Sequence, residues 1–338
     1  MRFSLVAASV LILVGAPAAR ADDLVKMDET TKKSVGKALA WLATQQNPDG
    51  SWSDGKYPHN TAITSFAMLA FLSQGHLPNQ GQYGAEVAKG MRFLIASQRE
   101  EDGYLVGARG GNMYCHGMAT LCLAELWGST GEDAIKPVLK KAVDLILKSQ
   151  VPGDTGHGGG WRYEPRPSGA DISVTIMQVM ALRAAKNVGF YVPNDKFTNA
   201  IKYVERCYNP YNGGFAYQAT GTGVAGFART AAGCCVLYLT GNEKSDKLPK
   251  AIEYLKDNFD SSQHFFYGHY YASHAMHQVG GKEWADWYAR ICQYLLPRQD
   301  PDGYWSESDR SSTGPVYQSS IAVIIMSVPS HYLSIFQR

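Results

Sequence analysis

The sequence predicts an all-α fold, an (α/α)6 toroid of six helix pairs around a central cavity. Two features support this prediction. A helix-turn unit recurs six times along the chain, and each unit joins a charged amphipathic helix to a second helix that is apolar nearly all round. A helix without a polar face must be covered on every side. The second helices are therefore expected to form an inner ring and the first helices an outer ring.

The unit is defined by its best copy, Lys37 to Trp52, in which an amphipathic helix ends near Gln46, a turn follows at Gly50 and Trp52 closes over that turn. A near-constant period of about 50 residues indicates a repeat architecture, in which each unit buries its apolar face against its neighbours. The six anchor residues, spaced by 52, 52, 58, 51 and 40 residues, are Gln46, Gln98, Gln150, Tyr208, Phe259 and Gln299.

The apolar helices are expected at 61–73, 113–127, 171–186, 227–239, 270–279 and 316–326. Their apolar residues follow spacings of three and four rather than two, which argues against strands. The segment 187–195, with Gly189 and Pro193, is expected to be a turn between units. When the six helices are laid over one another, small residues share one column, which favours close packing of a ring: Ser65, Gly117, Thr175, Ala231, Ala275 and Ser320.

Residues 1–21 are predicted to be a signal peptide. Arg2 precedes a mostly apolar run from Phe3 to Ala16 that is short for a bilayer span, and small residues precede a cut before Asp22. An uncleaved anchor is the alternative. Cleavage leaves 22–338, expected to be a single toroid domain because the repeat has no linker, and implies a periplasmic or extracellular location. No other stretch is apolar enough to cross a membrane.

Charge excludes two classes of partner. The chain has 32 basic and 30 acidic residues, and the predicted signal removes Arg2 and Arg20 but no acid, so the mature protein is formally neutral. A neutral protein has no general field to attract nucleic acid or anionic lipid. We therefore expect neither as a partner, and the oligomeric state stays open.

The six cysteines do not define a disulfide framework. An even count in an exported protein permits disulfides, but the spacing contains no C-x-x-C pattern and a chain of this size does not need them. Most are expected to be small buried apolar residues, with the pairing left open. They are Cys115, Cys122, Cys207, Cys234, Cys235 and Cys292.

The anchor unit resembles the repeat of squalene cyclases and of protein prenyltransferase β subunits. That repeat has a basic residue, a small residue, an aromatic or aliphatic pair, then Gln and Gly-x-Trp. The best copy has Lys37, Ala38, Trp41, Leu42, Gln46, Gly50 and Trp52 in these places, and the third has Lys141, Ala142, Leu145, Ile146, Gln150, Gly159 and Trp161. The sixth is similar, with Arg290, Tyr294, Leu295, Gln299, Gly303 and Trp305. The resemblance implies a toroid in which the Gln and Trp of each QW motif staple an outer helix to the start of the next inner one.

The catalytic acid of the cyclases is missing from the matching stretch of this sequence. In those enzymes a D-x-D-D-T-A stretch opens an inner helix, and its middle Asp protonates the substrate. The matching stretch here is 171–176, where Asp171 and Thr175 are kept but Ser173 and Val174 replace the paired acids. A serine hydroxyl is too weak an acid to protonate an alkene. Ordinary squalene cyclisation is therefore not expected.

The zinc site of the prenyltransferases is not carried over either. Those enzymes hold zinc with an Asp and a Cys two residues apart and a later His. The corresponding helix starts, at 225–227 and 271–272, supply none of these ligands. We predict no metal and no cofactor. If the protein is an enzyme, the resemblance implies a terpenoid cyclase or transferase without the usual acid or zinc triad.

Polar residues at the starts of the inner helices are the site candidates. Asp171, Arg229, His116 and His274 are the candidate catalytic residues, and the candidate ligand-binding residues are Cys115, Trp161, Tyr163, Ser173, Tyr271 and Gln318. Asp171 has two structural alternatives, an ion pair with Arg229 and an N-cap. His116 and His274 are three units apart and should lie on opposite walls, which argues against one metal ion between them. The glycine-rich loop 156–163 is the expected rim of the cavity.

The leading hypothesis for function is an exported toroid that binds an isoprenoid or lipid-like ligand in its cavity, since aromatic residues abound near the starts of the inner helices. An alternative is a polysaccharide-active lyase or hydrolase, using Asp171 and Arg229 with a histidine as proton carrier. A third reading is a protein-interaction module. The expected partner is thus a hydrophobic small molecule or a glycan.

Overall fold

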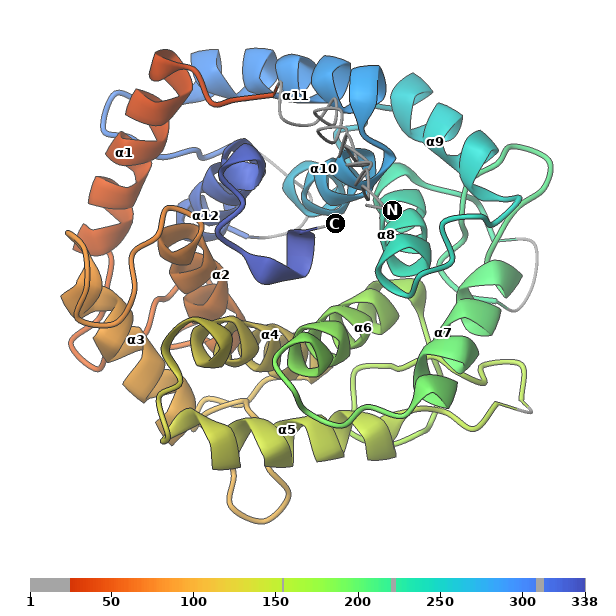
Figure 1. Cartoon of the computed structure of the whole chain (residues 1–338), viewed down its shortest axis with the longest axis horizontal. Helices are drawn as coiled ribbons and strands as arrows, with labels where there is room; N and C mark the ends of the chain where they lie inside the picture. The colour runs from red at the N-terminus through yellow and green to blue at the C-terminus, as the bar shows by residue number, and fades with distance from the viewer. Residues whose placement is uncertain (1–24, 154, 220–222, 308–312, 338) are drawn as a thin grey trace, which may run out of the picture.

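Two concentric rings of helices make up the computed structural model (Figure 1), which describes residues 25–153, 155–219, 223–307 and 313–337. The outer ring contains α1 (Glu29–Thr44), α3 (Gly84–Ala96), α5 (Ile135–Ser149), α7 (Asn194–Arg206), α9 (Leu248–Asp257) and α11 (Gly281–Leu295). The inner ring contains α2 (Thr61–Leu72), α4 (Met113–Thr130), α6 (Ile172–Asn187), α8 (Phe227–Leu239), α10 (Phe265–Val279) and α12 (Pro315–Ser327).

The inner ring is closed, because α12 packs against both α10 and α2. Within the described residues there are isolated β-bridges but no strand. The predicted all-α toroid is confirmed. The predicted signal peptide, residues 1–21, lies outside the described residues. In the part of the chain that the structure describes, no helix combines the length and apolar character needed to cross a bilayer.

The fifth inner helix differs from its expected range. It begins at Phe265 rather than at residue 270. The additional first turn contains Gly268, where a Cβ would lie 2.7 Å from the Phe227 ring of α8. A close approach between two inner helices explains why a weak helix former is kept at this position.

The anchor glutamines of the repeated units join consecutive outer helices. The Gln46 side-chain amide donates to the Gly50 carbonyl at 3.0 Å and to the Glu86 carbonyl of α3 at 2.8 Å. Gln98, Gln150 and Gln299 repeat this pattern with carbonyls of α5, α7 and α1, namely those of Val138, Lys196 and Ser34. The last of these bonds closes the outer ring.

The tryptophans hold each outer helix to the following inner helix. The Trp52 indole N–H donates to the Leu42 carbonyl at 2.8 Å, and its backbone N–H donates to the Thr64 hydroxyl at 2.9 Å. Trp161 and Trp305 form the same pair of bonds, with Thr175 and Ser319 as the hydroxyl partners.

The predicted column of small residues therefore needs a correction. Thr175 aligns with Thr64 and Ser319, one position before Ser65 and Ser320.

Aromatic side chains meet across the axis of the inner ring. Tyr271 of α10 donates its hydroxyl to the Met177 sulfur of α6 at 3.1 Å. Tyr270 packs edge-on against Phe66 of α2, with ring centroids 5.7 Å apart, and Phe66 packs in the same way against Tyr317 of α12. The ring is thus bridged by side chains at this level.

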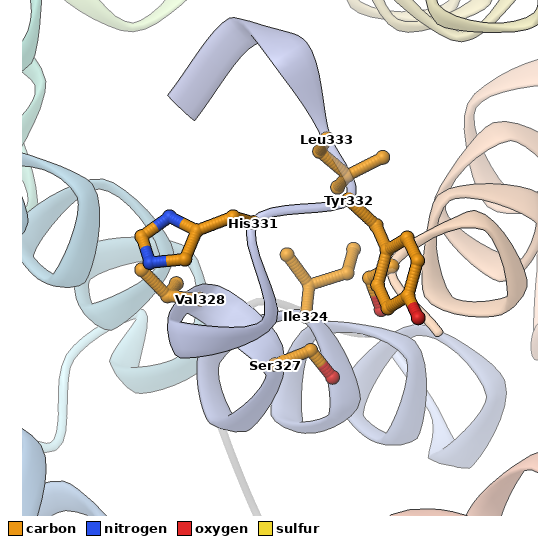
Figure 2. A pocket seen from close by; sticks show the side chains of 7 residues that line it. Ile324, Ser327, Val328, His331, Tyr332 and Leu333 are labelled. Carbon is orange, nitrogen blue, oxygen red and sulfur yellow. The ribbon is translucent and has the colours of Figure 1, made fainter. Parts of the chain in front are cut away.

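A C-terminal tail, residues 328–337, lies across the ring at the end where the inner helices terminate (Figure 1). It contains η3 (Val328–Ser330) and η4 (Ser334–Phe336). The buried Glu125 carboxylate of α4 accepts hydrogen bonds from the backbone N–H groups of Ser334 and Ile335 and from the Ser334 hydroxyl, at 2.8 to 3.0 Å. A shallow pocket lies between the tail and the end of α12 (Figure 2).

Candidate functional site

The starts of the inner helices are brought together at the opposite end of the ring by the loops that precede them. The backbone N–H of Met113, at the start of α4, donates to the Tyr163 carbonyl at 2.9 Å. That of Ile172, at the start of α6, donates to the Tyr217 carbonyl at 3.0 Å. Each loop is therefore bonded to the neighbouring inner helix, and the side chains of α4, α6 and two loops converge near residue 171.

Asp171 is the N-cap of α6 and has no solvent exposure. Its Oδ1 accepts hydrogen bonds from the Val174 backbone N–H at 2.9 Å and from the Ser173 hydroxyl at 2.5 Å. Its Oδ2 has no hydrogen-bond partner among the described residues. The carboxyl is thus fixed through one oxygen, while the other is buried without a donor, an arrangement that costs free energy when the group is ionised.

Burial raises the pKa of the Asp171 carboxyl above its ordinary value. The hydrogen bonds from Ser173 and Val174, the charge of Arg162 and the nearby Tyr217 hydroxyl oppose this shift but do not outweigh it. Because Oδ1 already accepts two hydrogen bonds, a proton on this carboxyl would reside on Oδ2. The site therefore contains a carboxylic acid that keeps its proton to a higher pH than an exposed aspartate.

Four partly exposed tyrosines surround this acid. The Tyr114 hydroxyl donates to the Ser173 hydroxyl, and the Tyr267 hydroxyl donates to the Ser173 carbonyl at 3.1 Å. The hydroxyls of Tyr163 and Tyr217 are 2.6 Å apart, and the Tyr114 and Tyr163 rings are 5.9 Å apart. We call these four residues, from α4, α10 and two loops, the tyrosine collar.

The cation beside Asp171 is Arg162, and not the predicted Arg229. A guanidinium nitrogen of Arg162 lies 4.0 Å from Asp171 Oδ2. Arg162 follows Trp161, and an isolated bridge pairs Trp161 with Asp171, so the backbone itself brings Arg162 to the acid. The expected Asp171–Arg229 ion pair is wrong, since Arg229 lies beside Tyr254 of α9 and forms no ion pair with any described residue.

The two candidate histidines lie away from the acid. The Leu105 backbone N–H donates to Nδ1 of His116, and Nε2 of His116 is 3.0 Å from the Ala142 carbonyl of α5. Burial lowers the pKa of His116 to about 4. His274 is buried in the middle of α10, where its ring meets Tyr270 edge-on at 4.8 Å. These contacts place His116 in the scaffold between α4 and α5, and His274 in the interior of the ring.

The predicted ligand-binding residues separate into two groups. Tyr163 and Ser173 belong to the site, and Tyr271 lies next to it, with its ring 4.9 Å from that of Tyr267. The others have structural contacts. Trp161 is a QW tryptophan, Cys115 contacts Asn60 at the start of α2, and Gln318 bonds both backbone groups of Glu307.

Two polar residues with defined contacts, Tyr114 and Glu125, are not among the candidates predicted from the sequence. Tyr114 is the second residue of α4, beside the Cys115 and His116 that drew attention. A comparison of first-turn positions across the units could have found it. Glu125 lies in the interior of an apolar helix and is nearly fully buried, so a lone acid in an otherwise apolar run was the available signal.

The structure adds two facts about metals and thiols. Within the described ranges, no group of three or more His, Cys, Asp or Glu side chains is placed to hold a metal ion. All six cysteines are buried and free.

The cluster has the composition of a Brønsted acid site in an aromatic surrounding. A buried carboxyl that retains its proton can donate it to a bound molecule. Aromatic faces bind apolar chains and also stabilise positive charge through their quadrupoles. Such an arrangement can hold an apolar molecule and protonate it.

The prenyltransferase alpha-alpha toroid domain family model matches residues 2–168 and 168–269. The chain therefore belongs to this family. No curated protein matches the sequence.

Solved structures share the fold at low sequence identity. A type II terpene cyclase, MstE from Scytonema, in complex with geranylgeranyl dihydroxybenzoate, is 13% identical, with a TM-score of 0.62 over 90% of this chain and 98% of that one. An α-1,6-mannanase of Salegentibacter sp., an inactive variant in complex with α-1,6-mannotriose, is 9% identical, with a TM-score of 0.67 over 91% and 100%. Cellobiose 2-epimerase from Bacillus thermoamylovorans is 10% identical, with a TM-score of 0.67 over 88% and 98%. This fold thus occurs both in a terpene cyclase and in proteins named for glycans.

Proposed function

We propose that the protein binds an isoprenoid or similarly lipid-like molecule against the tyrosine collar, with the Asp171 carboxyl facing the ligand as a proton donor. The supporting observation is the buried Oδ2 of Asp171, which lacks a hydrogen-bond donor beneath four tyrosine rings. A buried polar atom without a partner is rare in folded proteins and requires an explanation, and in this proposal the explanation is a bound ligand.

The surroundings of Asp171 favour an apolar ligand over a glycan. Hydrolysis of a glycosidic bond uses two carboxyl groups on either side of it. Among the described residues, no second carboxyl takes part in the hydrogen bonds of the tyrosine collar. All four collar hydroxyls already bond to Ser173 or to each other, so the faces of the rings are what the collar offers to a ligand.

The acid of this proposal differs from that of the motif in squalene cyclases. Ser173, which occupies the place of the middle acid, is itself bonded to Asp171 and to Tyr114. In the proposal Asp171 carries the proton, the Ser173 hydroxyl and the Val174 N–H hold its Oδ1, and Tyr114 donates to the Ser173 hydroxyl. The proposed reaction class is proton transfer to an electron-rich double bond of the bound chain.

Binding of geranylgeraniol, measured by native mass spectrometry and by titration of intrinsic fluorescence, tests the proposal. We expect a one-to-one complex, and Tyr217→Ala should weaken it about tenfold, because an aromatic contact of about 1.5 kcal/mol is lost. Tyr191→Ala is the matched control, since Tyr191 is 83% exposed in the turn between α6 and α7. Binding of α-1,6-mannotriose or cellobiose with no binding of geranylgeraniol would contradict the proposal.

We also propose that residues 1–21 direct export, as the sequence predicts. The measurement is N-terminal sequencing of the protein recovered from outside the cytoplasm of its host. We expect the mature chain to begin at Asp22. A chain that begins at Met1 would overturn this part of the proposal without bearing on the ligand.

A further inference from the structure

We propose that Arg162 is the receptor for an anionic head group, so that the preferred ligand of this site is an isoprenoid or lipid-like chain that ends in a carboxylate or a phosphate. This inference rests on the proposed function. It adds the chemical class of the head group and the residue that recognises it.

The first observation is that the guanidinium of Arg162 has a defined position but its N–H groups have no acceptor among the described residues. It lies over the Tyr163 ring, 5.3 Å from the centroid, and its side chain is 33% exposed. Its acidic neighbour, Asp171 Oδ2, is 4.0 Å away, which is longer than a hydrogen bond. Within the described residues it donates no hydrogen bond. Its five N–H donors are therefore available, in a planar fork that matches a carboxylate or a phosphate.

Other arginines of the chain are engaged in a way that Arg162 is not. Arg99 forms hydrogen bonds to both carboxylate oxygens of Asp102. Arg290 donates to Asp260 while it lies over the Phe259 ring, and Arg206 donates to the Gly158 carbonyl. Arg162, beside the buried acid, thus lacks the hydrogen-bond acceptor that each of these three arginines has.

The second observation is that the backbone of Arg162 is fixed by its neighbours. Trp161 is tied through its indole to α5 and through its backbone N–H to Thr175. Tyr163 accepts from the Met113 backbone N–H and pairs its hydroxyl with Tyr217. A receptor held on both sides loses less conformational freedom on binding than a free surface arginine does.

The third observation is the position of Arg162 relative to Asp171. The guanidinium is partly exposed, whereas Asp171 Oδ2, 4.0 Å from it, is fully buried, so we place an anion bound to Arg162 at the outer edge of the tyrosine collar. The apolar chain of the same molecule would then lie on the rings, with the acid beside it. The geometry thus orients an amphiphile with its head at Arg162.

Binding of three probes with the same chain tests the inference: geranylgeraniol, geranylgeranoic acid and geranylgeranyl phosphate. The wild-type protein should bind at least one of the two anions about tenfold or more tightly than the alcohol, which is the effect of a charge-assisted hydrogen bond. Which anion is preferred distinguishes a carboxylate head from a phosphate head. The preference should decrease when salt is raised.

Variants at Arg162 decide the outcome. Arg162→Gln should bring the ratio between anion and alcohol close to one while binding of the alcohol is kept, which also shows that the variant folds. Arg162→Lys should retain part of the preference, since the charge remains but the fork is lost. Arg166→Gln, an exposed arginine of the same loop, is the matched control and should keep the full ratio.

The two proposals fail in different ways. If the alcohol binds but the wild-type ratio is close to one, or if Arg162→Gln keeps the ratio, the assignment of Arg162 is overturned while ligand binding stands. If none of the three probes binds, the proposed function and this inference are both overturned.

Discussion

At the scale of single residues, Asp171 combines a structural and a chemical role. Its Oδ1 caps α6 by accepting from the Val174 N–H, a common and stabilising use of aspartate at a helix start. Burial makes the ionised form unfavourable in the folded protein and raises the pKa of this carboxyl, whose Oδ2 has no donor among the described residues. One carboxyl thus helps to start the helix and has a raised pKa next to the tyrosine collar.

The stability of an Asp171→Asn variant should depend on pH relative to wild type. The folded protein holds the Asp171 proton at pH values where the unfolded chain has lost it, because burial raises the pKa in the folded state. This contribution to the free energy of unfolding is full below the ordinary pKa of aspartate and disappears as pH rises through the raised pKa. Asparagine does not titrate, so the stability of the variant minus that of wild type should increase over this range.

Urea denaturation of both proteins at a series of pH values measures this difference. Asp144→Asn removes an exposed carboxyl that pairs with Lys140 on α5 and serves as the control for a lost charge. A difference for Asp171→Asn that is flat or falls with pH would show that the carboxyl is not held in its protonated form by burial.

Residue roles could be predicted from the sequence only where they are local. The N-cap at Asp171 was one of the alternatives because Ser168, Gly169 and Ala170 before it favour a helix start there. The partner of Asp171 could not be predicted, since it depends on the bridge between Trp161 and Asp171 that carries Arg162 to the acid. His116 shows the same limit, because its contacts lie on another helix and on the preceding loop.

At the scale of elements, the repeated units with an anchor glutamine and a tryptophan form two kinds of joint. The tryptophan attaches an outer helix to the inner helix that follows, and the glutamine attaches it to the next outer helix. The two units without an anchor glutamine use other contacts. At the fifth, the Arg290 guanidinium lies 3.9 Å from the Phe259 ring centroid.

Gln299→Ala should destabilise the protein by about 2 kcal/mol, because two hydrogen bonds to the carbonyls of Gly303 and Ser34 are lost. The amides of α1 should also exchange faster, since this glutamine joins α1 to the last unit. Gln45→Ala is the control, as Gln45 is exposed and its side chain bonds only to Thr44 among the described residues. Thermal unfolding and hydrogen exchange check both effects. An unchanged stability for Gln299→Ala would mean that the joint does not hold the ring.

The helices were the most predictable elements, because helix period and apolar pattern are local properties of the chain. Five of the six inner helices lie close to their expected ranges. The exception, α10, contains a glycine whose reason is a neighbouring helix, and no pattern within its own segment could reveal that. The joint between consecutive outer helices was likewise not predicted, since it connects residues 40 or more positions apart.

At the scale of the whole molecule, the two ends of the toroid differ. The end with the starts of the inner helices carries the tyrosine collar and Asp171, and the other end is covered by the C-terminal tail (Figure 1). Nothing in the tail sequence indicated that Glu125, more than 200 positions away, would receive its backbone N–H groups. Burial raises the pKa of Glu125 also, with the tail donors opposing the shift.

Glu125→Gln should release the tail without unfolding the ring. The amide of glutamine presents N–H groups where the carboxylate accepted from Ser334 and Ile335, so buried donors would oppose each other. The amides of Ser334 and Ile335 should exchange about 10- to 100-fold faster, with the melting temperature little changed.

Ser129→Ala is the control for this prediction. Ser129 lies one helical turn after Glu125 and bonds to its backbone carbonyl rather than to the tail. Equal exchange rates for the tail amides in wild type and Glu125→Gln would show that the carboxylate does not hold the tail.

The contact between α12 and α2 has a consequence for how the chain is made. Phe66 of the first inner helix is synthesised well before Tyr317 on α12, the residue against which it packs. Until α12 has been synthesised, the inner ring is open and exposes an apolar face at each end, and both faces can form non-native contacts. The incomplete chain therefore needs protection from aggregation, by a chaperone or by delayed folding, until α12 closes the ring.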